Sequence, residues 1–152
     1  TTAATWKIKE IRVWERLFTT DPDKYRPKLA DAIFTLLWNY RTGLDTSLAQ
    51  ALGQRGLREQ EILAGLRPAG STAPVDYEIL AAHTPNEFWD WHDLTGALYN
   101  LALVHKKAGD LATGLQFMLR QVKVYERLAQ VDPVNYQAAL DQARADAAAF
   151  AP

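Results

Sequence analysis

The three histidines are the residues most suited to chemistry near neutral pH, because imidazole both moves protons and binds metals. They are His83, His92 and His105, and no HExxH pattern accompanies them. His92 has Asp90 and Asp93 beside it, which makes it the best candidate for a weak metal site. Zinc sites need several ligands at defined spacings, and these are missing here. We therefore expect His92 to be a partly exposed helical histidine, and we predict no metal and no cofactor.

Other catalytic signatures are also absent from the sequence. The phosphate-binding loop motif GxxxxGK[ST] does not occur. The segment 53–56 has glycine at both ends but matches this motif too poorly to count as a phosphate-binding loop. The chain has no cysteine, so it holds no thiolate ligand, cysteine nucleophile or disulfide. Among its 18 acidic residues no pair stands out as a general acid and base. We predict that the protein is not an enzyme.

Aromatic side chains offer recognition instead of catalysis. The chain has five tryptophans, and two of them, Trp89 and Trp91, stand in the segment 88–92. Neighbouring side chains on a helix point about 100° apart, so these rings cannot all face one core. We expect one of the two tryptophans to be an exposed aromatic anchor for a partner. The alternative is that the extra ring packs under a loop or against a short helix at Tyr77.

Composition describes the chain that must position these residues. Its 152 residues, 48% of them apolar, are enough for one domain that buries about two thirds of its surface. The 17 Lys and Arg against 18 Asp and Glu leave no basic excess, so we predict no nucleic-acid partner. No stretch approaches the ~18 apolar residues of a membrane span. We predict no membrane association and, by default, a cytoplasmic location.

One template recurs three times along the chain. Each copy has an aromatic residue, Glu, any residue and Leu, then Pro and a second aromatic at matching distances, over 14–25, 77–88 and 125–136. The aromatic and the Leu share a helical face, and Pro ends the helix, so each copy is predicted to join two helical hairpins. The copies begin 63 and then 48 residues apart. A Pro-, Gly-, Ser- and Thr-rich stretch in the longer interval predicts an inserted loop at about 67–75.

The best-formed unit spans residues 98–115. It has the large and small apolar positions of a first helix, a Gly-Asp turn, and a small residue early in a second helix: Leu98, Leu101, Ala102, Gly109, Asp110 and Gly114. This unit resembles the tetratricopeptide (TPR) repeat. His105 stands where the family has an aromatic residue, and Pro133 comes about two turns late. That lengthening resembles the long-helix variants found beside bacterial signalling ATPases.

The resemblance implies an all-α fold, with antiparallel helical hairpins stacked as a short TPR-like right-handed solenoid and residues 1–152 forming a single domain. The resemblance, with its late proline, implies a long helix over about 111–130, and apolar periodicity predicts further helices over about 5–20, 29–43, 48–66 and 136–150. We expect the helix over 48–66 to be broken at Gly53 and Gly56. No segment alternates in the manner of a strand.

The resemblance also implies where a partner binds, because TPR ligands contact the concave surface lined by the first helix of each pair. The corresponding positions are Asp31, Phe34, Trp38, Arg41, Gly96, Tyr99, Leu103, Lys106 and Lys107. Tyr99 and Leu103 stand where the family's carboxylate clamp needs Lys and Asn, so we expect a helix or an extended apolar segment instead. For Lys106 and Lys107, a solvated helix end is an equal alternative.

The function expected from this resemblance is a protein- or peptide-binding scaffold or sensor module. The alternative is self-association, or a structural role inside a larger bacterial signalling protein. The helix over 5–20 is the second half of a hairpin, so its apolar face, with Trp6, Ile11 and Trp14, lacks one neighbour. We expect either a second copy of the molecule on that face, or that the chain, which begins at Thr1, is a piece of a longer protein.

Overall fold

The computed structural model describes residues 2–85 and 88–152, and within these it contains helices and turns but no strand. Its α-helices are α1 (Thr2–Thr20), α2 (Pro22–Tyr40), α3 (Thr46–Leu63), α4 (Phe88–Lys107), α5 (Leu111–Val131) and α6 (Pro133–Ala148). Two short 3₁₀ helices, η1 (Arg41–Gly43) and η2 (Tyr77–Ala82), lie in the connections. For the described residues, the predicted all-α class is confirmed.

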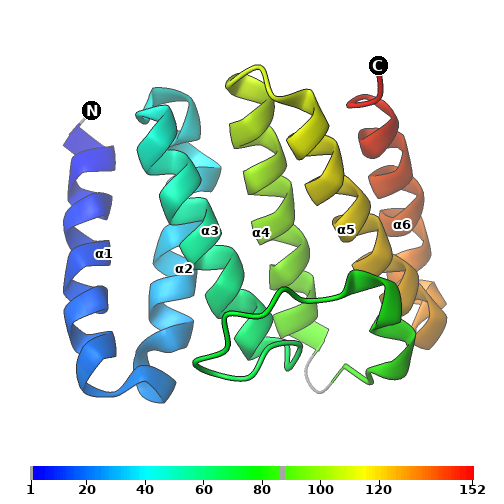
Figure 1. Cartoon of the computed structure of the whole chain (residues 1–152), viewed down its shortest axis with the longest axis horizontal. Helices are drawn as coiled ribbons and strands as arrows, with labels where there is room; N and C mark the ends of the chain where they lie inside the picture. Colours follow the sequence, from blue (N-terminus) through cyan, green and yellow to red (C-terminus); the bar gives the residue numbers. More distant parts are fainter. Residues whose placement is uncertain (1, 86–87) are drawn as a thin grey trace.

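The helices stand side by side in chain order, and each packs mainly against the one before it and the one after it (Figure 1). Successive helices run antiparallel. In addition, α2 contacts α4 past the intervening α3. α2 and α4 therefore lie on the same side of the row.

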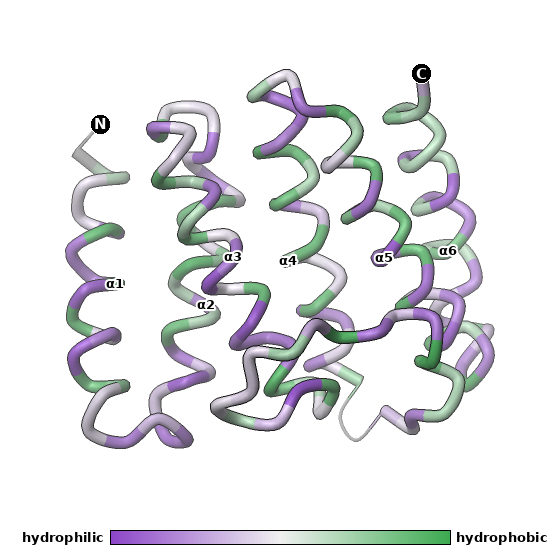
Figure 2. The backbone as a smooth tube through the Cα atoms, viewed as in Figure 1, coloured by the Kyte–Doolittle hydropathy of each residue, from purple (hydrophilic) through white to green (hydrophobic). Residues whose placement is uncertain are grey.

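Two clusters of buried apolar side chains hold the row together. One joins α1, α2 and α3 around Leu29 and Leu36, and the other joins α4, α5 and α6 around Leu98 and Met118. Val104 of α4 belongs to the first cluster, so the two meet between α3 and α4. Figure 2 shows the sequence pattern behind this packing, since hydrophobic and hydrophilic residues alternate along every helix.

Two of the three predicted joints are built as expected. Asp21 and Asp132 cap α2 and α6, and each side chain accepts a hydrogen bond from the backbone N–H three residues later, at 3.3 Å in both cases. Pro22 and Pro133 then occupy the first helical turn, where no N–H donor is needed. The middle joint differs, because Tyr77 begins the 3₁₀ helix η2 and does not lie at the end of a longer helix. It follows an irregular loop, so there is no helix for it to end.

The predicted break in the helix over 48–66 is wrong, because α3 is continuous. Gly53 and Gly56 are buried and face the neighbouring helices. A Cβ on Gly53 would lie 2.6 Å from Leu101 Cδ2, and one on Gly56 would lie 2.8 Å from Ile33 Cγ2. The glycines therefore let α3 lie close to α2 and α4, and this packing outweighs their poor helix propensity.

The turn between α4 and α5 follows the prediction. Gly109 takes a φ of +83°, and the Asp110 side chain caps α5 by accepting a hydrogen bond from the Thr113 N–H at 3.1 Å. A Cβ on Gly114 would lie 3.0 Å from the Ala102 carbonyl oxygen. The expected close approach of the two helices at this glycine is confirmed.

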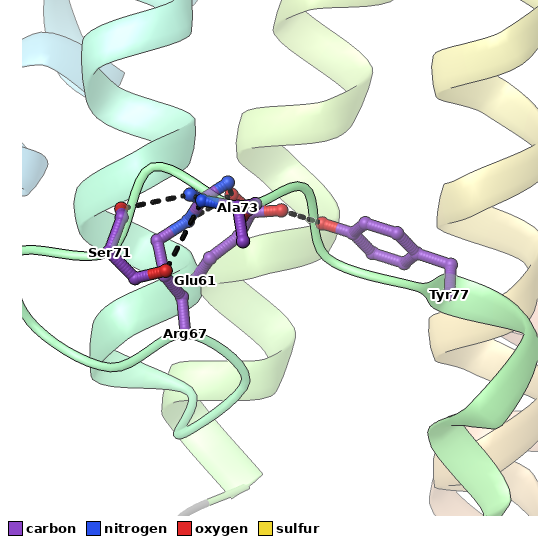
Figure 3. A network of polar contacts seen from close by, with 5 residues as sticks. All are labelled: Glu61, Arg67, Ser71, Ala73 and Tyr77. Carbon is purple, nitrogen blue, oxygen red and sulfur yellow. Dashed lines mark hydrogen bonds and ion pairs between the residues drawn. The ribbon is translucent and has the colours of Figure 1, made fainter.

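A nearly buried polar network fixes the loop between α3 and η2 (Figure 3). The Nε and Nη2 of Arg67 donate to Glu61 Oε1 at 3.2 and 3.0 Å, and its Nη1 donates to the carbonyls of Ser71 and Ala73. The Tyr77 hydroxyl donates to Glu61 Oε2 at 2.6 Å. Burial and the adjacent carboxylate raise the pKa of Tyr77, so this hydroxyl stays a donor. The inserted loop is thus anchored to the end of α3.

Candidate partner-binding groove

A groove of about 640 Å³ lies between α2, α4 and α6, with side chains of α5 at its base. It is lined by Phe34, Trp38, Trp89, His92, Asp93, Thr95, Gly96, Tyr99, Gln121, Tyr125, Ala139, Gln142, Ala143 and Asp146. α2, α4 and α6 are alternate helices of the row (Figure 1). The groove therefore follows the surface that these alternate helices share.

A row of aromatic rings crosses the groove from α2 to α4. Phe34 and Trp38 lie one turn apart on α2, and their ring centroids are 5.8 Å apart at an interplanar angle of 14°. The centroids of Trp38 and Tyr99, which belongs to α4, are 6.3 Å apart. Trp38 is still 53% exposed. We call these three residues the aromatic row, and a large ring that is held by neighbours yet open to solvent is typical of a binding hot spot.

Trp89 and Trp91 lie in opposite environments. Trp91 is 1% exposed, and its indole N–H donates to the Ala64 carbonyl at 2.9 Å. Trp89 is 71% exposed at the groove, where its ring meets that of His92 edge to face at 6.0 Å. The structure corrects the prediction of Trp91 as an anchor, because this residue shares the buried stripe of α4 with Leu94. Trp89 is the exposed member of the pair.

Polar side chains form the base of the groove. The hydroxyls of Thr95 and Tyr125 lie 3.1 Å apart, and Gln121 Nε2 donates to the Thr95 carbonyl at 3.2 Å. These bonds tie α4 to α5. The buried Oε1 of Gln121 has no hydrogen-bond partner among the described residues. It is a free acceptor at the base of the groove.

The groove is acidic. The described residues that line it include Asp93 and Asp146 but neither Lys nor Arg. Burial raises the pKa of Asp93 against the opposing effect of His92, and the like charge of Asp31 raises it further. The groove therefore has two carboxyl groups in its lining and no Lys or Arg there to balance them, although the raised pKa of Asp93 makes this carboxyl easier to protonate.

The predicted partner-binding residues fall into two groups, apart from Asp31, which lines a smaller cavity between α2, α3 and α4. Phe34, Trp38 and Tyr99 come together in the groove, along with Gly96. Arg41, Leu103, Lys106 and Lys107 instead line a separate depression of about 410 Å³ near the ends of α2 and α4.

The charged residues of this second group have partners within the fold. Arg41 Nη1 donates to the Trp38 carbonyl at 3.2 Å, and Lys107 Nζ donates to the Thr42 carbonyl. The Lys106 ammonium lies 5.1 Å from the centre of the Phe150 ring. These contacts close helix ends and join neighbouring segments, which favours the structural alternative for the two lysines.

The sequence analysis missed the side of the groove that α6 provides. Ala139, Gln142, Ala143 and Asp146 line it at spacings of three and four residues, as one face of a helix does. The signal was present in the joint over 125–136. That joint implies that the helix after it starts another pair and faces the same surface as α2 and α4.

No group of three or more His, Cys, Asp or Glu side chains in the described part of the chain is arranged to hold a metal ion, and this includes His92 with its acidic neighbours. None of the described helices combines the length and the apolar character that crossing a bilayer requires. Comparisons with protein-family models, curated proteins and solved structures found no match. A function must therefore be inferred from the groove.

Proposed function

We propose that the protein is a TPR-like scaffold or sensor module that binds a protein or peptide segment in the groove between α2, α4 and α6. The aromatic row carries this proposal. The Trp38 ring stacks on Phe34 and lies at a tilt against Tyr99, yet it is half exposed beside a hollow of about 640 Å³. A hollow of this size accepts several side chains of a bound segment.

The arrangement of the helices supports a short TPR-like solenoid. In such a solenoid the first helix of every pair lines one surface, and α2, α4 and α6 all contribute to the groove. His105, at the family's aromatic position, stacks on Phe117 with ring centroids 5.5 Å apart. The 21 residues of α5 agree with the long second helix of the variant.

The partner that suits this groove is an apolar segment with some positive charge. α4 has 20 residues and is about 30 Å long, so a helix of a few turns or an extended strand fits along it. The rings of Trp38 and Trp89 offer apolar contact, and Asp93 and Asp146 disfavour an acidic ligand. A terminal carboxylate clamped by Lys and Asn is not expected here.

A displayed peptide library tests this proposal. Peptides selected on the unmodified protein are expected to bind the Trp38→Ala/Tyr99→Ala double variant at least about tenfold more weakly, because two rings of the aromatic row are removed. Trp6→Ala is the matched control, since Trp6 is 64% exposed on α1 and lies outside the groove. Undiminished binding in the double variant, or equal loss in the control, would reject the groove as the binding site.

Self-association through α1 is the second candidate function. Trp6 and Val13 lie on α1 and are 64% and 50% exposed. The rest of the predicted apolar face is occupied, since Ile11 is 2% exposed and the Trp14 ring lies 6.2 Å from that of Tyr25. Sedimentation at several concentrations, comparing the unmodified chain with Trp6→Asp/Val13→Asp, tests this function. An unmodified chain that is strictly monomeric rules it out.

A further inference from the structure

A smaller cavity of about 140 Å³ lies beside the groove, between α2, α3 and α4. Phe34 and Asp93 line both spaces, so the cavity adjoins the aromatic row. Its walls are largely apolar and include Ile33, Leu37 and Leu57. The Phe34 ring packs against α4 at Gly96, where a Cβ would lie 2.6 Å from Phe34 Cε2, so a long side chain that reached this cavity from the groove would have to displace the ring.

Asn100 is a buried amide that lines this cavity. Its side chain is 1% exposed, and neither Oδ1 nor Nδ2 has a hydrogen-bond partner among the described residues. Buried polar groups in folded proteins are nearly always paired, so an amide with both atoms unpaired needs an explanation. The Asn100 oxygen is an acceptor for which the described chain supplies no donor.

Asp90 lines the same cavity and makes an interaction of its own, and the other two carboxylates there are Asp31 from α2 and Asp93 from α4. Neither makes a salt bridge within the described residues. The lining of the cavity includes neither Lys nor Arg. This space therefore combines two solvent-exposed carboxylates and a buried acceptor, without a cation of its own.

The spacing along α4 allows one ligand group to meet both features. Asp93, Ala97 and Asn100 lie on one stripe of the helix and all line the cavity. Ala97 is about 6 Å along the helix axis from Asp93 and about 4.5 Å from Asn100. A group at the level of Ala97 would lie between the carboxylate and the amide. Ammonium and guanidinium groups carry several N–H donors and no acceptor, so they can pair with the carboxylate and with Asn100 Oδ1 but not with the Asn100 Nδ2 donor.

We propose that this cavity is a slot for one basic side chain, Lys or Arg, of the segment that binds in the groove. The inference rests on the proposed function, because the bound segment delivers the side chain. The carboxylates of Asp31 and Asp93 attract the positive charge, and Asn100 Oδ1 accepts one of its N–H groups. The apolar walls contact the methylene stem, as they do for other partly buried Lys and Arg side chains.

Small amides test the slot separately from the groove. N-acetylarginine amide and N-acetyllysine amide carry the basic side chains without a peptide segment, and N-acetylnorleucine amide is the neutral control. NMR signals of the Asn100 side-chain amide, assigned by their loss in Asn100→Leu, report binding at low ionic strength. We expect a saturable shift with at least one basic amide and none with the neutral one. The tighter of the two basic amides identifies the preferred head group.

The double variant Asp31→Asn/Asp93→Asn is expected to weaken this binding at least about fivefold. Asp141→Asn is the matched control, since Asp141 is an exposed carboxylate on α6 that lines neither space, and it should leave binding unchanged. No shift with either basic amide, an equal shift with the neutral amide, or full affinity in the double variant overturns the slot. If the selected peptides still lost affinity in Trp38→Ala/Tyr99→Ala, the proposed binding in the groove would stand although the slot had failed. Failure of the slot and failure of the groove are therefore distinguishable.

Discussion

Replacing Asn100 with leucine is expected to stabilise the fold, although most core substitutions destabilise. The Asn100 side chain is 1% exposed and both its polar atoms are unpaired among the described residues. An unpaired buried polar group costs about 1–3 kcal/mol, and leucine removes this cost at nearly equal volume. Leu37 and Leu57 line the cavity that the new methyl groups would enter, so the new side chain meets apolar neighbours.

We therefore expect the free energy of unfolding of Asn100→Leu to rise by about 1–3 kcal/mol. For a chain of 152 residues this corresponds to a Tm higher by roughly 2–12 °C. Urea unfolding followed by tryptophan fluorescence measures the change, and an unaltered m value would show that both forms expose the same surface on unfolding. Asn39→Ala is the control, because Asn39 is exposed on α2 and should change stability by about 0.5 kcal/mol or less.

A loss of stability of more than about 1 kcal/mol in Asn100→Leu would refute this reasoning. It would mean that the Asn100 amide makes hydrogen bonds whose value exceeds the cost of burying it. The slot would then lose the unpaired acceptor on which it depends.

Glu61→Ala is expected to lower the free energy of unfolding by about 3–5 kcal/mol, because it leaves the Arg67 guanidinium nearly buried without its counter-ion. Urea unfolding measures this, and a loss below about 1 kcal/mol would contradict it. Gly53→Ala should destabilise by about 1–3 kcal/mol, since the new Cβ would lie 2.6 Å from Leu101 Cδ2. A higher Tm, as helix propensity alone predicts, would count against the close packing of α3. Asp93→Asn should stabilise the protein at neutral pH. The fold raises the pKa of Asp93, so the folded chain binds this proton more tightly, and the resulting stabilisation is present at low pH and lost as the pH rises through the folded pKa. Melting curves between about pH 3 and pH 7 should show the advantage of the variant growing with pH, and a constant difference would disprove the linkage.

The joints between helices were predictable from sequence where residues within one turn determine them, although apolar periodicity placed the start of the second helix at about 29 and α2 starts at Pro22. Asp-Pro at 21–22 and 132–133 caps one helix directly after the preceding one ends, and Gly109 supplies the left-handed turn before α5. The continuity of α3 was not predictable in this way. It depends on Leu101 and Ile33, which are distant in sequence and pack against the two glycines. Local propensity favoured a break that tertiary contacts prevent.

The groove was predicted only in part. A resemblance to a family indicates which residues lie on a surface, but it does not indicate which side chains contact one another. It placed Phe34, Trp38 and Tyr99 on one surface, and the structure brings their rings together. Sequence also indicated that either Trp89 or Trp91 is exposed. Which of the two is exposed depends on how α4 is rotated about its own axis. Contacts with residues distant in sequence set this rotation, among them the hydrogen bond from Trp91 to the end of α3.

Two features that disfavour the folded state occur together in the cavity beside the aromatic row. The Asn100 amide is unpaired, and burial disfavours the charged form of Asp93. Proteins tolerate such local costs where binding requires them. A basic ligand that pairs with both groups would stabilise the folded state, by about 1.4 kcal/mol at ten times its Kd.

That linkage separates a binding role for Asn100 from a merely structural one. Saturating N-acetylarginine amide or N-acetyllysine amide should raise the Tm of the unmodified chain by roughly 3–6 °C. Asn100→Leu should melt higher without ligand and respond less to it, because its hydrophobic side chain offers no acceptor. If Asn100 were structural, its loss would lower the Tm and leave the response to ligand unchanged. The two roles therefore predict opposite signs for the change in Tm that Asn100→Leu causes in the absence of ligand.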